Sequence, residues 1–164
     1  MWMIWAAAAW AAPSLSTDTW TWELGGRATV DFWTLGVQDS SVTLYPRLGV
    51  FLSEHVELIG GVGLFLADGG SASAFYVGGE YLFSGDGVRP YLGGTVGYGA
   101  VEFPRDQGPQ DVIATSLLLG ILVPCSRKIG VDIGGRANLY LWEEEPVLHI
   151  PMGYLGVRGF FGGG

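Results

Sequence analysis

The sequence predicts an all-β protein, an eight-stranded antiparallel up-and-down transmembrane β-barrel. Three observations predict it. Apolar and polar residues alternate with a period of two along eight segments, and shorter and longer connections alternate between those segments. In addition, charged residues fall on only one of the two faces that this alternation defines. The length of 164 residues fits a single domain.

The first expected strand, residues 20–32, shows the pattern most clearly. One face is apolar from Trp20 to Phe32, and the other carries Glu23, Arg27 and Asp31. Successive side chains of a strand point to opposite faces, whereas a helix would scatter these residues around its cylinder. The same alternation predicts strands at 42–52, 56–66, 74–83, 90–101, 112–123, 129–142 and 150–161.

The connections between these segments fall into two sets. Short turns are expected around 53–55, 84–87 and 124–128, and longer loops at 33–41, 67–73, 102–111 and 142–149. Such alternation is typical of a meander whose two ends differ. Closing eight strands into a barrel would leave no unpaired sheet edge.

Alternation alone does not decide which face lies inside. The apolar face carries no charge, and the opposite face carries no lysine, many glycines and tyrosines, and nine charges, namely Glu23, Arg27, Asp31, Arg47, Glu57, Glu80, Asp132, Arg136 and Arg158. A face so rich in glycine and tyrosine would be a poor coat toward water, so we place it in the lumen as a structural charge network. The alternative is a soluble, lipocalin-like barrel that turns the apolar face inward and binds a small apolar ligand.

The composition fits a narrow barrel. Glycine supplies 28 residues, and paired glycines inside five expected strands permit sharp curvature and leave room for lumen tyrosines, namely Tyr45, Tyr76, Tyr91, Tyr140 and Tyr154. Aromatic residues gather near expected strand ends, as in the girdles of membrane barrels: Trp20, Trp22, Phe32, Trp33, Phe75, Phe83, Phe103, Trp142 and Phe161.

The first residues indicate export. Residues 1–12 form an apolar run too short to cross a bilayer as a helix, and Ala9–Ala11 matches a signal-peptidase cleavage signature. We expect a signal peptide and leader at 1–17 with cleavage after Ala11, the barrel at 18–161, and a glycine tail at 162–164.

No catalytic, cofactor or metal site is predicted. Cys125 is the only cysteine, which excludes an internal disulfide, and a net charge of −8 argues against nucleic acid as a partner. Most acidic residues outside the strands lie in the longer loops, where Glu143, Glu144 and Glu145 form a candidate outer-rim acidic patch. A third alternative is a lipid-modifying hydrolase, with Ser71 or Ser73 as nucleophile beside His149 and Glu145.

Two strand sequences and the C-terminus carry a family resemblance. The segments RLGVFLSEHVEL (47–58), RPYLGGTVGY (89–98) and GVRGFF (156–161) resemble small bacterial outer-membrane β-barrel proteins of the OmpA/OmpX-like group. The last segment departs from that pattern at Gly159, where a bulkier residue is commoner. The resemblance implies an outer-membrane location in a Gram-negative cell envelope, longer loops that face outward, and contact with the barrel-assembly machinery during biogenesis.

We therefore expect a non-enzymatic, porin-like but closed outer-membrane barrel with a structural or surface-interaction role. An eight-stranded lumen is about filled by its side chains, so no open solute pore is expected. The expected partners are outer-membrane lipid and lipopolysaccharide, and the expected state is a monomer.

Overall fold

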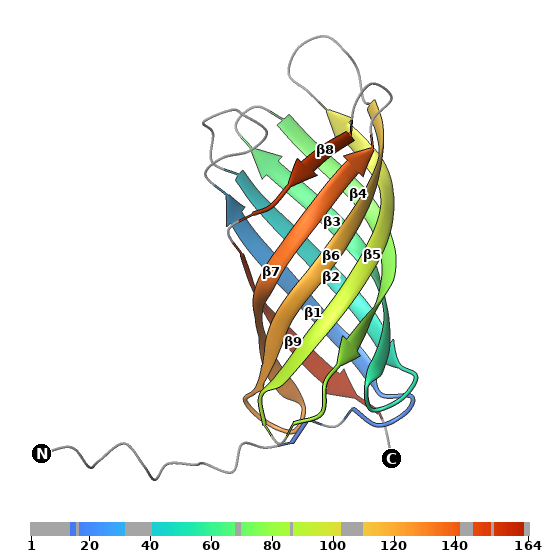
Figure 1. Cartoon of the computed structure of the whole chain (residues 1–164), viewed down its shortest axis with the longest axis vertical. Helices are drawn as coiled ribbons and strands as arrows, with labels where there is room; N and C mark the ends of the chain where they lie inside the picture. Colours follow the sequence, from blue (N-terminus) through green and yellow to red (C-terminus); the bar gives the residue numbers. More distant parts are fainter. Residues whose placement is uncertain are drawn as a thin grey trace, which may run out of the picture.

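The computed structural model describes residues 14–15, 17–31, 41–67, 70–85, 87–102, 110–141, 146–151 and 153–162. This part of the chain contains nine strands: β1 (Trp22–Asp31), β2 (Ser41–Phe51), β3 (Val56–Ala67), β4 (Gly70–Leu82), β5 (Arg89–Glu102), β6 (Gln110–Pro124), β7 (Ile129–Leu141), β8 (Pro146–His149) and β9 (Tyr154–Phe161). Consecutive strands pair antiparallel from β1 to β7, and β9 pairs with both β7 and β1 (Figure 1). The sheet is therefore a closed barrel, as predicted.

The eighth position of the barrel is shared by two strands. β8 pairs with the upper part of β7 and β9 with its lower part. The expected strand at 150–161 is therefore confirmed from Tyr154 onward, whereas residues 146–149 of the expected loop are strand. Pro151 has no N–H for the ladder, and Gly153 has a positive φ of 154°. The register shifts by one residue across this break, because Asn138 pairs with His149 whereas Gly134 pairs with Tyr154.

The two ends of the barrel differ, as the connections predicted. The short turns that follow β2, β4 and β6 lie at the end that we call lower, and β1, β3, β5 and β7 end at the opposite, upper end (Figure 1). One expected upper loop is wrong, because β3 continues to Ala67 and β4 already begins at Gly70. Small side chains at Ser71, Ala72 and Ser73 hide the alternation there.

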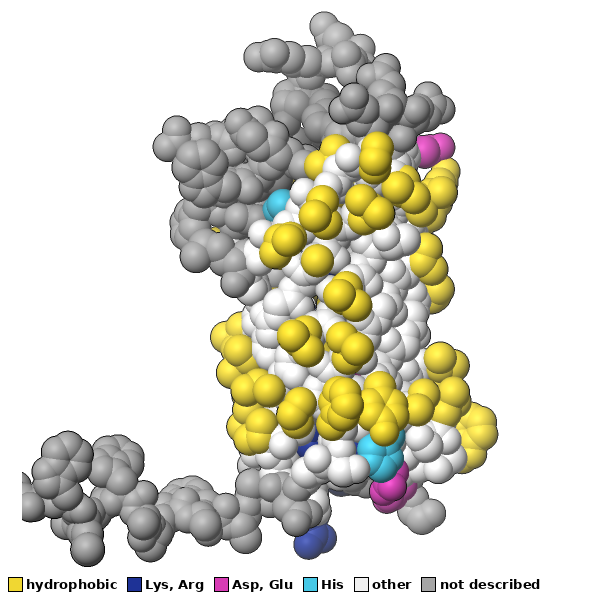
Figure 2. All heavy atoms as spheres, viewed as in Figure 1, with side chains coloured by type: hydrophobic (Ala, Val, Ile, Leu, Met, Phe, Trp, Pro, Cys, Tyr) yellow, Lys and Arg dark blue, Asp and Glu magenta, His cyan; other side chains and the backbone are white. Residues whose placement is uncertain are grey.

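The outer wall is apolar. Among the described strand residues, the outward side chains include exposed leucines such as Leu117 and Leu119, and the only charge is Asp111 near the upper end of β6. Figure 2 shows hydrophobic side chains spread over the visible wall, with charged side chains only near its two ends. The soluble alternative is therefore wrong, because the apolar face points out and the charged face points in. No helix of the described chain is long and apolar enough to span a membrane.

Exposed aromatic rings mark the lower end of this wall. Trp20, Trp22, Phe83 and Phe161 are exposed there, and Tyr81 packs edge-on against Phe83 with ring centroids 5.1 Å apart. Of the other predicted girdle residues, Phe75 is exposed farther up on β4. Phe32, Trp33, Phe103 and Trp142 lie outside the described residues.

Apolar side chains close the lower mouth of the lumen. We call this group the lower apolar plug; its members are Leu15, Phe51, Leu82, Leu122 and Phe160, and all are buried. Leu15 precedes the boundary at residue 18 that we expected for the barrel. Cleavage after Ala11, which stays a prediction, would leave Leu15 in the mature chain.

Glycines make room for the lumen tyrosines, as predicted. A Cβ atom at Gly61 would lie 2.6 Å from the Tyr76 hydroxyl, and one at Gly120 would lie 2.6 Å from the Tyr91 hydroxyl. The Tyr76 hydroxyl donates a hydrogen bond of 3.3 Å to the carbonyl of Pro46. Each ring thus occupies the space beside a residue that has no side chain, which allows close packing there.

Candidate functional site

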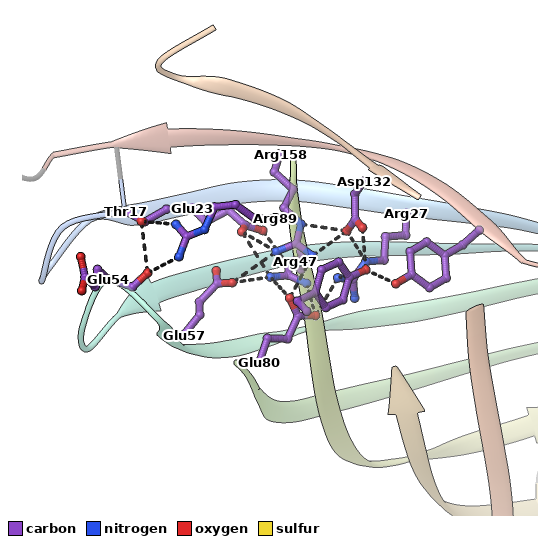
Figure 3. A network of polar contacts seen from close by, with 12 residues as sticks. Thr17, Glu23, Arg27, Arg47, Glu54, Glu57, Glu80, Arg89, Asp132 and Arg158 are labelled. Carbon is purple, nitrogen blue, oxygen red and sulfur yellow. Dashed lines mark hydrogen bonds and ion pairs between the residues drawn. The ribbon is translucent and has the colours of Figure 1, made fainter. Parts of the chain in front are cut away.

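Charged side chains from six strands converge in the lower half of the lumen (Figure 3). We call this group the charge cluster. It comprises Glu23 and Arg27 of β1, Arg47 of β2, Glu57 of β3, Glu80 of β4, Asp132 of β7 and Arg158 of β9. All seven belong to the nine lumen charges that the sequence singled out. Strand alternation turns each of them inward, and closure of the barrel brings them together from positions up to 135 residues apart.

Two arginines lie among the carboxylates of neighbouring strands. Arg47 contacts Glu23 at 2.7 Å through Nε, Glu57 at 2.9 Å through Nη2 and Glu80 at 2.7 Å through Nη1. Arg158 reaches Glu80 at 2.9 Å through Nη2, and its Nη1 lies 3.3 Å from Glu23 and 3.4 Å from Glu57. These two guanidinium groups therefore share three carboxylates.

Arg27 completes the cluster on the side of the tyrosines. Its Nη2 lies 2.6 Å from Glu80 Oε1, and its Nε donates a hydrogen bond of 2.6 Å to Asp132 Oδ2, which also accepts from Arg158 Nε at 2.8 Å. The Tyr91 hydroxyl donates to Asp132 Oδ1 at 2.5 Å and is hydrogen-bonded to the Tyr154 hydroxyl. Glu80 thus contacts all three arginines of the cluster.

The cluster fills the lumen at its own level. Side chains of Glu23, Glu57, Glu80 and Asp132 are fully buried, and those of the three arginines are at most 5% exposed. Removing an ion from water costs several kcal/mol, which only close partners on several sides offset. Three guanidinium groups and four carboxylates leave a formal charge of −1. The charged groups of this cluster contact one another on several sides, which suits a structural role.

One of the other two predicted lumen charges, Arg136, is not part of this cluster. Arg136 lies higher in β7, where it donates hydrogen bonds to Asn138 at 2.6 Å and Ser116 at 2.7 Å. The Asp31 side chain lies outside the described residues.

A further buried arginine, Arg89, was missed by the sequence reasoning, which began the expected strand at residue 90. Arg89 donates to Thr17 Oγ1 at 2.6 Å and to the carbonyl of Glu54 at 2.7 Å, and so ties the N-terminal segment to the β2–β3 turn (Figure 3). The inward parity of Arg89 relative to Tyr91 and Gly93 in the same strand could have shown it.

The structure does not assemble the hydrolase alternative. Ser71 and Ser73 are exposed on the outer face of β4. His149 belongs to β8, whose partner β7 lies across the barrel from β4 in the strand order. His149 stacks on the lumen residue Tyr140 with ring centroids 6.4 Å apart. Glu143, Glu144 and Glu145 lie outside the described residues, and the described chain contains no cluster of metal-binding side chains.

Comparison with solved structures identifies the fold. The N-terminal β-barrel domain of Pseudomonas aeruginosa OprF matches with a TM-score of 0.65 and 18% identity, over 87% of this chain and 98% of that one. Neisserial surface protein A matches with a TM-score of 0.71 and 15% identity, over 86% and 97%. A structure from the de novo design of transmembrane β-barrels matches with a TM-score of 0.54 and 15% identity, over 88% and 98%.

No family model and no curated protein matches the sequence. The likeness to the solved structures therefore shows the fold, that of the small eight-stranded outer-membrane barrels.

Proposed function

From a closed eight-stranded barrel with an apolar wall and a packed lumen, we propose a non-enzymatic, monomeric outer-membrane protein with a structural or surface-interaction role. The observation that carries the proposal is the division of side chains between the two faces. The outer face of the described strands is apolar over its middle, and the inner face holds a buried, mutually paired charge cluster. Such a barrel is matched to lipid outside and needs no water inside.

No active site is supported, because the candidate residues do not lie together, although the residue types for one occur in the sequence. The serine and histidine of the hydrolase alternative belong to opposite sides of the barrel and to different faces. The carboxylates of the charge cluster are buried under arginines. We infer from these arrangements that the protein acts by contacting other molecules at the two ends of the barrel.

Membrane fractionation tests the location. The complete chain, expressed in a Gram-negative host, is expected in the outer-membrane fraction, resistant to carbonate washing and released only by detergent. A detergent-free soluble monomer in the periplasm would overturn the proposal.

The partners follow from the two ends. We propose that the upper rim meets cation-bridged lipopolysaccharide through the acidic patch Glu143, Glu144 and Glu145. Calorimetry with Mg²⁺ should then show weaker binding when all three are changed to Gln, and unchanged binding would remove this partner. The C-terminal strand β9 places Phe161 on the outer face with 52% exposure, which supports its use as a signal to the barrel-assembly machinery.

A further inference from the structure

A separate cavity lies in the lumen above the charge cluster. Its volume is about 70 Å³. Its walls are largely apolar and include Phe65, Val101 and Val112 together with Tyr45 and Tyr140. Since one water needs about 10–15 Å³ of such space, the cavity has room for a small molecule.

Arg136 is the charged group that lines this cavity. Its side chain comes from β7, and its guanidinium carbon lies 4.0 Å from the centre of the Tyr45 ring. Nε and Nη2 donate to Asn138 Oδ1 and Ser116 Oγ, while the hydroxyl of Ser116 itself donates to Asn138 Oδ1 at 2.8 Å. These contacts fix the plane of the guanidinium group along one edge, and no hydrogen bond within the described chain uses Nη1.

Arg136 differs from the three arginines of the charge cluster in its counter-ions. Among the side chains that the structure describes, which do not include that of Asp31, no carboxylate lies within 4 Å of Arg136, whereas Arg47 has three such partners. Arg136 is nevertheless more than nine-tenths buried. Within the described part of the chain the contacts of Arg136 are with neutral groups, which is costly for a buried guanidinium group, so an anion in the cavity would stabilise it.

We propose that this cavity binds a small monocarboxylate with a short apolar body. The carboxylate accepts hydrogen bonds from Arg136, whose planar group matches that geometry, and the hydrocarbon part packs against Phe65, Val101 and Val112. A phosphate dianion fits the site less well, because one guanidinium group in apolar walls does not replace its hydration. The proposal concerns the interior of the barrel and is independent of the membrane in which the barrel lies.

The test is an NMR titration of the refolded chain in detergent micelles. Acetate, butyrate and benzoate are added in turn, and saturable shifts are expected at lumen resonances near Arg136, with affinity rising as the apolar body grows. Arg136→Gln should weaken benzoate binding roughly tenfold to a hundredfold, as expected for loss of hydrogen bonds to a charged group. Arg127→Gln, at an exposed turn position, is the matched control and should bind like the parent chain.

A second variant keeps the arginine and removes the space. Ala114→Leu projects into the cavity and should abolish saturable binding while Arg136 stays in place. Both variants must give the dispersed spectrum of a folded barrel to be compared. Absence of saturable binding by the parent chain, equal benzoate affinity in Arg136→Gln, or tighter binding of inorganic phosphate than of benzoate would each overturn the proposal.

Discussion

At the scale of the residue, the packing of the lumen depends on large side chains that lie beside glycines, which have no side chain. The Tyr91 hydroxyl occupies the space that a Cβ atom at residue 120 would need, which glycine leaves free. Arg158 is fully buried among four carboxylates. Such sites differ in how much change they tolerate, and neighbouring positions provide matched controls.

Gly120→Ala is expected to destabilise the barrel by about 1–3 kcal/mol, the usual cost of overpacking. Its Cβ would lie 2.6 Å from the Tyr91 hydroxyl and 2.7 Å from the carbonyl of Ile133. Gly135→Ala meets no atom within 4 Å on the outer face and should be neutral or stabilising by about 0.5–1 kcal/mol. Urea unfolding from lipid vesicles measures both, and equal effects would contradict this account of the glycines.

Glu80→Gln is expected to cost about 3–5 kcal/mol, the range for breaking a buried ion pair. Both oxygens of Glu80 face arginines, with Oε1 2.6 Å from Arg27 and 2.7 Å from Arg47, so an amide nitrogen must meet another donor. Arg158 also lies 2.9 Å from Oε2.

Glu57→Gln is the control for that variant and should cost about 1 kcal/mol or less. Glu57 Oε1 has no hydrogen-bond partner in the described chain, so an amide group can take that place while Oε2 still accepts from Arg47 at 2.9 Å. The Glu57→Gln change also removes one negative charge from a cluster in which four carboxylates face three arginines. Equilibrium unfolding compares the two, and a larger loss for Glu57→Gln would contradict the central place given to Glu80.

At the scale of the element, each strand has one side that faces lipid and one side that faces the packed lumen. Each strand presents apolar side chains outward and the lumen set inward, and a shift of one residue would exchange them. In β2, Pro46 has no N–H to donate to the ladder, and its own carbonyl accepts a hydrogen bond from the Tyr76 hydroxyl. At the β8–β9 break, Pro151 and Gly153 allow the inward parity to change.

Leu117→Arg tests the lipid-facing side of an element. Leu117 lies midway along β6 with 59% exposure, so arginine there should cost about 2–4 kcal/mol in a bilayer. Ser71→Arg, near the upper end of β4, should cost about 0–1 kcal/mol, because the charge reaches the interface. The measurement is urea unfolding from lipid vesicles, and equal tolerance of both would show that the wall does not face lipid.

At the scale of the whole molecule, the lumen is arranged in levels. The lower apolar plug closes the mouth, with Arg89 and Thr17 holding the N-terminal segment beneath it. The charge cluster lies above, and the cavity at Arg136 lies higher still. Only the highest of these levels leaves space.

This arrangement predicts a barrel that does not conduct. In planar bilayers the purified protein should give no steady channel current, because the charge cluster and the lower apolar plug are buried side chains without a continuous water path. A matched lipid-only membrane provides the baseline. Steady, large conductance with folded protein would contradict the packed lumen.

The closed eight-position barrel, its inward and outward faces and the identity of most lumen charges followed from the sequence by itself. They follow because alternation with a period of two is a local property, and a charge placed toward lipid is costly wherever it occurs. Phe160 inward and Phe161 outward, for example, are decided by parity alone. The continuity of β3 into Ala67 and the split of the last strand were not predictable in this way, since small residues and Pro151 blur the pattern.

Only the tertiary structure decided which charges meet. Closure and tilt of the strands bring Glu23 and Arg158 together across 135 residues while leaving Arg136 of β7 apart from Asp132 of the same strand. It also decided that Arg89 contacts Thr17 and the carbonyl of Glu54, and that Leu15 belongs to the lower apolar plug. Sequence alternation fixes the side of the wall on which a residue lies. The height of a residue along the barrel and the partner that it contacts depend on how the closed strands are staggered, which is a property of the whole barrel.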